Sequence, residues 1–257
     1  MGRSRSIRSL VFQLGGQALA LLVCALWWSA LPDPLFNQPL GTLILDRSGQ
    51  VLDARIATDE QWRFSPSSEQ LPKTWETALI HFEDRRFYTH PGFDLLAIAR
   101  AARDNLREGR ITSGASTISM QVIRLSRGAT RRTIREKLLE IILATRLEMS
   151  YSKAQILALY ANNAPFGGNI VGLEAASWRY FNRSPLDLSW AEAALLAVLP
   201  NNPARLHLAR NRDSLKEKRD RLLDSLVGAG KLDVFMANSA KMEPMPQGLY
   251  PVPRALP

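Results

Sequence analysis

A cluster of charged and aromatic residues at 83–92 has the residue types needed for acid–base chemistry. Glu83 follows an apolar stretch, stands near aromatic residues, and is followed by a turn that begins at His90. Removal of a carboxyl group from water raises its pKa, and a glutamate with a raised pKa suits a general base or a general acid. A solvated charge cluster at a helix end has the same composition, so this segment taken alone does not establish a site.

The second segment of interest, residues 114–121, reads Gly-Ala-Ser-Thr-Ile-Ser-Met-Gln and precedes a helical stretch. Small and hydroxyl-bearing residues at such a place can present backbone N–H groups to the oxygens of a phosphate. Arg124 follows closely and would add charge-assisted hydrogen bonds. A flexible polar loop that ends in a helix cap is the alternative interpretation.

The third segment, residues 132–140, reads Arg-Thr-Ile-Arg-Glu-Lys-Leu-Leu-Glu. On a helix, Lys137 and Glu140 share one face because side chains three positions apart are neighbours, while apolar residues take the other face. An exposed pair of this kind stabilises a helix by only about 0.2–0.5 kcal/mol and is usually not functional. The three segments gain weight from their combination.

Periodicity places these segments in a mainly α-helical chain with a small N-terminal β-hairpin. The hairpin is predicted from alternating apolar and polar residues at 41–52 around a central turn. Ser152 and Ser189 are expected to cap two helices, because Gln155 and Glu192 follow three residues later and complete capping boxes. Three-to-four periodicity predicts helices at 75–82, 94–108, 130–149, 152–162, 172–180, 189–199 and 213–227.

The N-terminal region contains a candidate membrane span. Residues 10–31 carry no charge and would rise roughly 33 Å as a helix, which is enough to cross the apolar core of a bilayer. Arginines precede this stretch and tryptophans lie near its far end, which predicts a cytoplasmic N-terminus and an exported remainder. A cleavable signal peptide is the alternative, but Trp28 fits a small-x-small cleavage site poorly. We expect four regions: a basic tail (1–9), a transmembrane anchor (10–31), one domain (40–235) and a Pro-rich tail or linker (236–257).

Composition limits the classes of function. The chain has 257 residues, a net charge of +9, three histidines and one cysteine, Cys24. A single cysteine excludes an internal disulfide and a cysteine-based zinc site, and scattered histidines do not suggest a histidine metal site. The positive charge favours an anionic membrane face, a phosphorylated substrate or nucleic acid, although arginine-rich genome composition produces it too. An exported domain would not meet nucleic acid, so that partner is not expected.

In order and spacing, the three segments resemble the peptidoglycan glycosyltransferases of family 51, the polymerase domain of class A penicillin-binding proteins. The first motif of that family, Glu-Asp-x-x-Phe-x-x-His-x-Gly, is matched by Glu83, Asp84, Phe87, His90 and Gly92. The second, Gly-x-Ser-Thr-Ile-x-x-Gln, is matched by Gly114, Ser116, Thr117, Ile118 and Gln121. The third retains Lys137 and Glu140 but has Glu136 where the family has an arginine, with Arg135 beside it.

A longer signature further along the chain strengthens the resemblance, which covers about residues 40–235. It is matched by Lys153, Ile156, Leu157, Tyr160, Asn162, Phe166, Gly167, Gly172, Ala175, Ala176, Tyr180, Phe181, Glu192, Pro200 and Pro203. The strings at 164–168 and 175–178 look most like the penicillin-binding protein 1C branch. The sequence stops where the transpeptidase domain of these proteins would begin, so we expect a chain that does not bind penicillin.

The resemblance implies a lysozyme-like, mainly α-helical glycosyltransferase domain. Such a domain polymerises lipid II into β-1,4 glycan strands with inversion and releases undecaprenyl pyrophosphate. The resemblance makes Glu83 the general base and Glu140 the residue that assists departure of the pyrophosphate. It implies one cofactor, a divalent metal ion (Mg²⁺ or Mn²⁺) bound at Glu140, and no organic cofactor. The resemblance also implies the substrate-binding residues, which are Asp84, Phe87, His90, Gly114, Ser116, Thr117, Gln121, Arg124, Arg132, Lys137 and Asn162.

The resemblance also implies where the protein works. Lipid II and the nascent glycan are the expected substrates, with membrane lipids, a separate transpeptidase and other cell-wall synthesis proteins as partners. The expected place is the periplasmic or outer face of the bacterial inner (cytoplasmic) membrane. A mobile hydrophobic subdomain that dips into the bilayer is expected at 93–128, with apolar surface from Phe93, Leu95, Leu96 and Ile98. A lysozyme-like enzyme that cleaves glycan and an inactive membrane-anchored scaffold stay open as alternatives.

Overall fold

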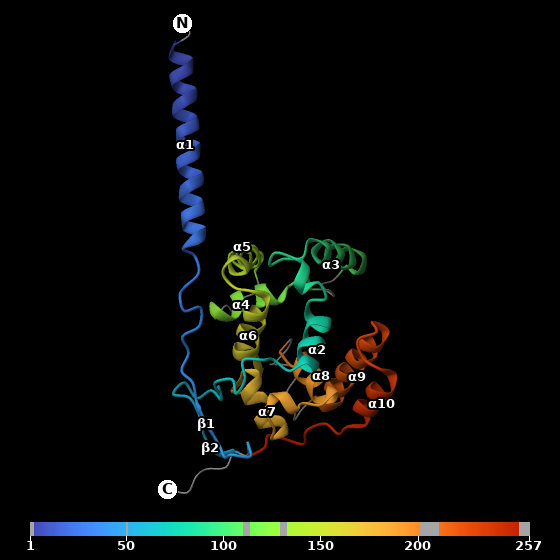
Figure 1. The fold of residues 1–257 in the computed structure, drawn as a ribbon. Coiled ribbons are helices and arrows are strands. Elements are labelled where there is room, and N and C mark those ends of the chain that lie inside the picture. Colours follow the sequence, from blue (N-terminus) through green and yellow to red (C-terminus); the bar gives the residue numbers. More distant parts are fainter. Residues whose placement is uncertain (1–2, 50, 110–113, 129–132, 201–210, 252–257) are drawn as a thin grey trace.

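A computed structural model describes residues 3–49, 51–109, 114–128, 133–200 and 211–251 of the chain. One long N-terminal helix is followed by a helical body, so the predicted mainly α-helical class is confirmed (Figure 1). The described helices are α1 (Arg3–Trp28), α2 (Lys73–Glu83), α3 (Leu95–Glu108), α4 (Ile118–Ser126), α5 (Ile134–Ser150), α6 (Lys153–Asn163), α7 (Leu173–Phe181), α8 (Trp190–Val198), α9 (Arg212–Gly228) and α10 (Val234–Met242). The described strands are β1 (Thr42–Leu45), β2 (Val51–Arg55), β3 (Pro165–Gly167) and β4 (Ile170–Val171).

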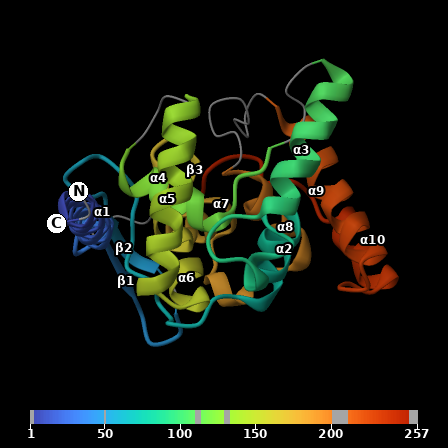
Figure 2. The ribbon, with the colours of Figure 1, turned by 90° about the horizontal axis from the view of Figure 1, so that it is seen from above.

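The centre of the body is α8, in which every residue from Ala193 to Val198 is buried. Its many alanines let neighbouring helices approach closely, and α2 and α9 pack against it. A second group of helices forms where α4 packs against α5 and α6 (Figure 2). Burial of one large apolar side chain stabilises a fold by about 1.5–3 kcal/mol, so these contacts fix α2 and α4 firmly. The first motif begins at Glu83, the last residue of α2, and the second motif runs into the first turn of α4.

Helix ends follow the capping residues in the sequence. Both predicted capping boxes are present, because Ser152 and Ser189 accept hydrogen bonds from the backbone N–H of Gln155 and Glu192, whose side chains return to the cap residues. Thr133 caps α5, so this helix begins at Ile134 instead of the predicted residue 130.

The predicted hairpin is also present. β1 and β2 pair in antiparallel register, with one irregularity between Ile44 and Leu45. Asp46 stabilises the turn, since its Oδ1 accepts hydrogen bonds from the backbone N–H and the hydroxyl of Ser48, both at 2.7 Å. Gly49 has a φ of +80°, in the left-handed region that favours glycine.

One helix, α10, was not predicted from the sequence. It packs against α8 and α9 and crosses residue 235, where we predicted that the domain ends. The buried Arg219 of α9 donates hydrogen bonds to the carbonyl oxygens of Lys241 and Glu243 at 3.1 and 3.0 Å. These bonds attach the end of α10 to the body. The predicted domain limits themselves stay a prediction.

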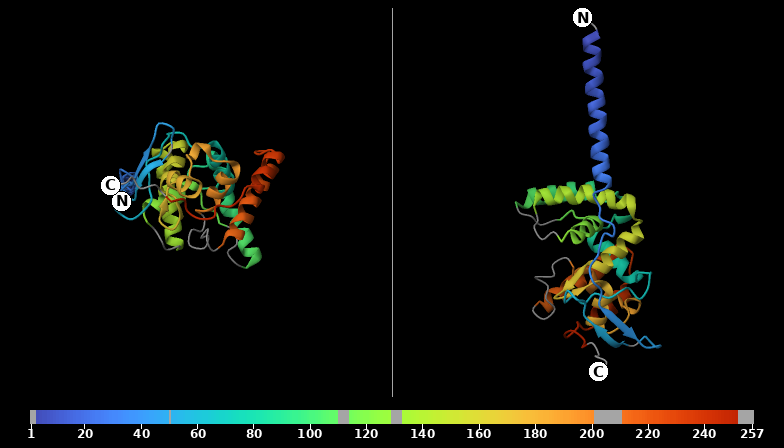
Figure 3. Two further views of the ribbon diagram at one scale, coloured as in Figure 1. Left: turned by 90° about the horizontal axis from the view of Figure 1, so that it is seen from below. Right: turned by 90° about the vertical axis from the view of Figure 1, so that its left-hand side faces the viewer.

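The N-terminal helix extends away from the body (Figure 3). The part of α1 nearer to the body, from Leu19 to Leu26, includes large apolar side chains that are more than half exposed. Within the described part of the chain, no helix combines the length and the hydropathy needed to cross a bilayer. The transmembrane anchor predicted at 10–31 is therefore not confirmed and stays a prediction.

The end of α1 is attached to α5. Nε1 of Trp27 donates a hydrogen bond to the carbonyl oxygen of Ile142 at 3.2 Å, and Nε of Arg146 donates one to the carbonyl oxygen of Trp28 at 2.9 Å. The guanidinium of Arg146 also lies 4.0 Å from the centroid of the Trp28 ring. A cation over an indole ring contributes about 0.5–1 kcal/mol at an exposed site, so Arg146 adds a second kind of contact between α1 and the body.

The apolar surface predicted at 93–128 is only partly present. Leu95 and Leu96 are 67% and 68% exposed at the start of α3. In contrast, Met120 and Val122 of α4 are fully buried, because α4 packs between α5 and α6. α4 is therefore part of the core, and the mobile subdomain expected at 93–128 stays a prediction.

Candidate active site

Glu83 is the last residue of α2, and its carboxylate meets α4. Its Oε2 accepts a hydrogen bond from Nε2 of Gln121 at 2.7 Å, while its Oε1 is buried and has no hydrogen-bond partner among the described residues. This bond brings together the first and second motifs of the sequence. A carboxylate with one oxygen held and the other unpartnered keeps an acceptor for an incoming proton.

Burial raises the pKa of Glu83 above the ordinary glutamate value. Loss of water around the carboxylate is the main cause; the hydrogen bond from Gln121 and the positive charge of Arg124 act against it, and the negative charge of Asp84 adds to it. A more basic carboxylate takes a proton from a hydroxyl group more readily. These surroundings therefore favour the work of a general base.

Asp84 is buried, and its carboxylate fixes the geometry of the motif. It accepts hydrogen bonds from Nε2 of His90 at 2.9 Å and from the backbone N–H of Ile118 at 3.0 Å. Nδ1 of His90 accepts from the backbone N–H of Gly92 at 3.2 Å, which places the proton of the neutral ring on Nε2. A carboxylate at the first residue of α4 also interacts favourably with the helix dipole.

Three further motif residues have positioning roles. Thr117 caps α4, and its hydroxyl donates to the carbonyl oxygen of Gly92 at 2.6 Å. Gly92 has a φ of +98°, and a Cβ there would lie 2.6 Å from the carbonyl oxygen of Ala144, so only glycine fits. Phe87 is fully buried, with Nζ of Lys153 4.5 Å from its ring centroid. Asp84, His90, Phe87 and Thr117 are all buried, although Asp84 and Thr117 also line the cavity described below, and their predicted substrate contacts stay a prediction.

A line of polar contacts connects the two glutamates. Nη2 of Arg124 donates to Oε1 of Gln121 at 3.4 Å, and Nη1 of the same guanidinium lies 3.9 Å from Oε1 of Glu140. Nζ of Lys137 lies 3.8 Å from Oε2 of Glu140 and donates a hydrogen bond to the hydroxyl of Ser116. The structure thus brings Gln121, Arg124, Glu140, Lys137 and Ser116 together, and their roles in catalysis and substrate binding stay a prediction.

Among the described residues, no cluster of metal ligands surrounds Glu140, where a metal ion was predicted. Glu140 is buried, and the charged groups nearest to it are the cations of Arg124 and Lys137. No group of three or more acidic, histidine or cysteine side chains in the described residues could hold a metal ion. One carboxylate between two cations does not fit a metal held by the protein, so metal dependence stays a prediction and enters no step below.

Glu83 opens on a cavity of about 520 Å³ between the end of α2, the start of α3 and residues 114–117. Three arginines that sequence analysis had not singled out line it: Arg85, Arg86 and Arg100. Nε of Arg86 donates to Oδ2 of Asp94 at 2.8 Å. Arg85 and Arg86 stand at variable positions of the first motif, so only their place in the structure identifies them as residues of the cavity. A cavity with a base and several cations suits a substrate that carries phosphate.

Three residues from the sequence analysis lie outside this arrangement. Asn162 lines a small cavity with Ser67 and Glu174 that contains none of the residues of the three motifs. Arg132 lies outside the described residues. Glu136 stands in the first turn of α5, where an acidic side chain is favoured, and pairs with Arg127 at 3.3 Å.

The chain contains one Ser-x-x-Lys string, Ser150 to Lys153, the pattern of penicillin-binding nucleophiles. Its lysine is engaged, because Nζ of Lys153 donates to Oε1 of Glu148 at 2.7 Å and to the carbonyl oxygen of His90 at 2.8 Å. The string spans the connection between α5, which ends at Ser150, and α6, which begins at Lys153. The expectation that the chain does not bind penicillin stays a prediction.

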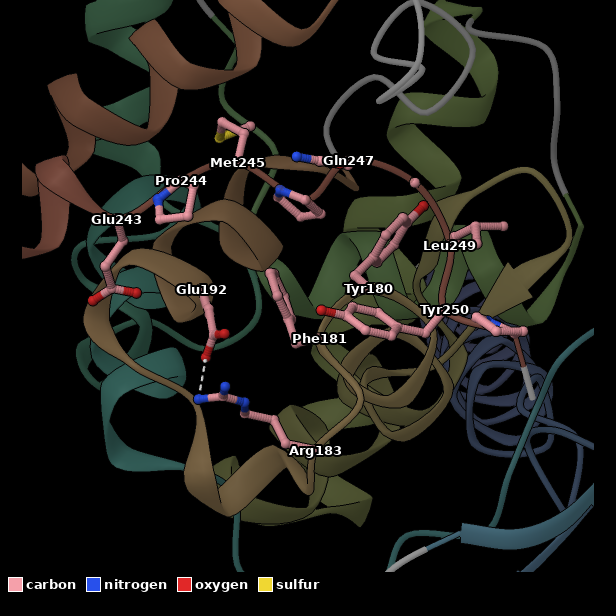
Figure 4. A pocket seen from close by; sticks show the side chains of 13 residues that line it. Tyr180, Phe181, Arg183, Glu192, Glu243, Pro244, Met245, Gln247, Leu249 and Tyr250 are labelled. Carbon is pink, nitrogen blue, oxygen red and sulfur yellow. Dashed lines mark ion pairs between the residues drawn. The ribbon is translucent and has the colours of Figure 1, made fainter. Parts of the chain in front are cut away.

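A second, larger cavity of about 620 Å³ lies between α7, α8 and the segment after α10 (Figure 4). Aromatic side chains of Tyr180, Phe181 and Tyr250 line it, together with an ion pair of 3.5 Å between Arg183 and Glu192. No residue of the three motifs lines this cavity. Size alone therefore does not identify the site.

Comparisons with known proteins bear on this geometry. The sequence profile of the transglycosylase family matches residues 48–227. The chain belongs to this family. It is 36% identical over 239 residues to penicillin-binding protein 1C of Escherichia coli K12, and 34% identical over 237 residues to penicillin-binding protein 1A of Neisseria flavescens. The predicted resemblance to the transglycosylase domain of class A penicillin-binding proteins is confirmed.

The chain spans less than a third of the length of these relatives. The matches cover 92% and 91% of this chain but 30% and 29% of the two relatives. Among solved structures, it is similar to the crystal structure of penicillin-binding protein 1A from Haemophilus influenzae, with a TM-score of 0.43 and 16% identity over 82% of this chain and 21% of that chain.

Proposed function

We propose that this chain is a peptidoglycan glycosyltransferase that polymerises lipid II into β-1,4 glycan strands. One observation carries the proposal. Glu83, whose burial raises its pKa, opens on a cavity lined by arginines and is connected through Gln121 and Arg124 to Glu140. A base on one side and a group of cations on the other are what transfer of a sugar from a pyrophosphate requires.

In the proposed mechanism Glu83 activates the acceptor. The 4-hydroxyl of the incoming lipid II loses its proton to the Glu83 carboxylate as its oxygen attacks the anomeric carbon of the growing chain. The new C–O bond forms as the bond from the anomeric carbon to the pyrophosphate oxygen breaks. Attack opposite the leaving group inverts the anomeric centre, so an α-linked donor gives a β-1,4 linkage, as in inverting glycosidases.

The cations serve the leaving group. An undecaprenyl pyrophosphate is already a weak base, so it needs its charge balanced more than it needs a proton. Arg124 and Lys137 are near enough to Glu140 to be oriented by it, at 3.9 and 3.8 Å. We assign to Glu140 the orientation of these cations during departure of the pyrophosphate. We keep Arg132 as a further cation of the same group.

The place of the enzyme is part of the proposal. We propose that residues 10–31 anchor the lysozyme-like domain at the periplasmic or outer face of the bacterial inner membrane, because lipid II stays in the bilayer. A separate transpeptidase and other cell-wall synthesis proteins are the proposed partners. Mg²⁺ or Mn²⁺ dependence is proposed only as an outcome to be tested by adding a chelator to the polymerisation assay.

The proposal is tested by lipid II polymerisation with the purified chain in detergent, comparing wild type with Glu83→Gln. General-base catalysis contributes about 10²–10⁴-fold, so we expect long glycan strands from wild type and a loss of that size in the variant. Glu217→Gln is the matched control, because Glu217 is exposed on α9. Glu83→Gln with wild-type activity would remove Glu83 from its role as base. Digestion of purified sacculi without lipid II would favour the cleaving enzyme, and inactivity of the folded wild type would favour the scaffold.

A further inference from the structure

The cavity of about 620 Å³ between α7, α8 and residues 243–251 has no part in the proposed reaction. Small-molecule sites in proteins have volumes of about 300–1,000 Å³, so this cavity has room for a short oligomer. Residues 243–251, here called the C-terminal segment, form one of its walls. Together with α7, this segment belongs to the end of the body that lies away from α1 (Figure 1).

Hydrogen bonds hold the C-terminal segment near both of its ends. Near its start, the guanidinium of Arg212 donates to the carbonyl oxygen of Met245. At its other end, the backbone N–H of Tyr250 donates to the carbonyl oxygen of Arg179 at 2.7 Å, and Nη1 of Arg179 donates to the carbonyl oxygen of Tyr250 at 2.5 Å. A wall that is already ordered loses little conformational entropy when a ligand binds, so this arrangement favours binding.

The cavity is lined by aromatic rings and by planar polar groups (Figure 4). The rings are those of Tyr180, Phe181 and Tyr250. Tyr180 is buried, and its hydroxyl donates to the carbonyl oxygen of Phe166 at 2.8 Å, so this residue is part of the inner wall. In contrast, Tyr250 is 46% exposed, and its ring is available to a ligand.

The planar polar groups belong to Arg183, Glu192, Glu243 and Gln247. Nη1 of Arg183 lies 3.5 Å from Oε2 of Glu192, and the arginine side chain is 48% exposed, so it has further N–H donors for a ligand. An anion in the cavity would meet the carboxylates of Glu192 and Glu243, and a cation would meet Arg183. A neutral molecule with hydroxyl groups can form hydrogen bonds with all of these side chains.

We propose that this cavity binds a β-1,4 glycan, the product that the chain is proposed to make. A sugar ring has a face of C–H groups that packs on an aromatic ring, and an edge of hydroxyl groups that bonds to planar polar side chains. Tyr250 and Phe181 supply contacts of the first kind, and Arg183 and Glu192 supply contacts of the second kind. If α1 anchors the chain, this end of the body lies on the side toward which a strand leaves the membrane (Figure 1). The inference rests on the proposed function for the identity of the glycan.

The first test is calorimetric titration of the full chain in detergent with chitotetraose, a soluble β-1,4 glycan. Tyr250→Ala removes one ring but retains the backbone hydrogen bonds that hold the C-terminal segment. The loss of one aromatic contact should weaken binding about three- to tenfold. Arg183→Gln removes charged donors and should weaken binding by about the same factor.

Phe235→Ala and Arg221→Gln are the matched controls. Phe235 is an exposed aromatic residue outside the cavity lining, and Arg221 pairs with Glu217 on α9 at 2.7 Å. Both variants should bind chitotetraose as wild type does. The proposal is overturned if wild type does not bind, or if the cavity variants and the controls have equal affinity. Equally tight binding of maltotetraose, an α-1,4 glycan, would overturn the assignment to a β-1,4 glycan.

The second test is the length of the strands that the chain makes from lipid II. A growing strand held at a second site dissociates less often, so Tyr250→Ala should produce strands about three- to tenfold shorter. The initial rate of lipid II consumption should change little, because the cavity is separate from Glu83. Glu83→Gln is measured in parallel: if it polymerises lipid II as wild type does, the proposed function fails. If it is inactive while Tyr250→Ala has wild-type affinity and wild-type strand lengths, only the glycan site fails.

Discussion

The buried carboxylate of Glu83 has consequences for stability as well as for catalysis. Because burial raises its pKa in the folded state, the folded chain holds this proton more tightly than the unfolded chain does. Folding stability therefore falls as the pH rises through the interval between the unfolded and the folded pKa of Glu83. Above that interval the ionised carboxylate is a cost to the fold, as can be expected of the base proposed above.

Glu83→Gln should consequently increase the free energy of unfolding at pH 7. The amide is neutral, and its carbonyl oxygen can still accept the hydrogen bond from Gln121. The gain should disappear near pH 4 and below, where glutamate is protonated in both states, since its unfolded pKa is about 4.3. Urea unfolding of wild type and variant at the two pH values measures this, with Glu217→Gln as control. A variant less stable than wild type at pH 7 would contradict the reasoning.

Glu136 shows how one departure from a family pattern fits its own surroundings. Glu136→Arg would break the 3.3 Å pair with Arg127, place two cations together, and put a positive charge at the N-terminus of α5. We expect a loss of about 0.5–1 kcal/mol in unfolding free energy. Polymerisation should be unchanged or higher, because the substitution restores the cation that the family pattern has at this position. A large loss of activity in a folded variant would show that Glu136 has a role of its own.

At the scale of elements, local signals predicted what local physics determines. Capping boxes at Ser152 and Ser189 and the turn at Asp46 depend on residues a few positions apart, and the structure contains them. α10 was missed because its nine residues carry a weak pattern and are fixed by contacts with α8 and α9.

The same difference between local signals and long-range contacts applies to the site. Motif matches identified Glu83, Gln121 and Glu140, but not which motif residues would be buried. Asp84 bonds to the first residue of α4 over 34 positions of sequence, and such long-range pairing has no local signal. The arginines of the cavity, Arg100 among them, were hidden for the same reason.

Removal of a cap should destabilise the chain by a measurable amount. Ser152→Ala loses the acceptor for the backbone N–H of Gln155 and one side of the capping box, at a cost of about 1 kcal/mol. Ser214→Ala, an exposed position inside α9, is the control and should change the unfolding free energy by less than about 0.5 kcal/mol. Equal effects of the two substitutions would mean that the box at Ser152 adds nothing beyond the general cost of losing a hydroxyl.

At the scale of the whole molecule, α3 and α5 lie at the end of the body from which α1 extends (Figures 1 and 3), and both helices carry exposed apolar residues. Leu138 and Ile142 of α5 are 57% and 50% exposed, and Ile142 is next to the attachment of Trp27. Leu95 and Leu96 at the start of α3 add to the same end. An apolar surface at the base of a proposed anchor, on a chain with a net charge of +9, fits the interface of an anionic bilayer.

If this end of the body lies in the bilayer interface, a spin label at position 138 should report apolar surroundings after reconstitution into anionic vesicles. We expect Leu138→Cys, made in a Cys24→Ala background, to gain accessibility to oxygen and lose accessibility to a polar nickel complex. The control is Phe235→Cys, where the native side chain is apolar and 79% exposed, on α10, a helix that lies away from α1 (Figure 1). That label should stay accessible to the nickel complex. The comparison separates contact with lipid from mere hydrophobicity, because both native residues are exposed and apolar. Similar accessibility at the two positions would show that α5 does not face the bilayer, and the anchor would then hold the body clear of it.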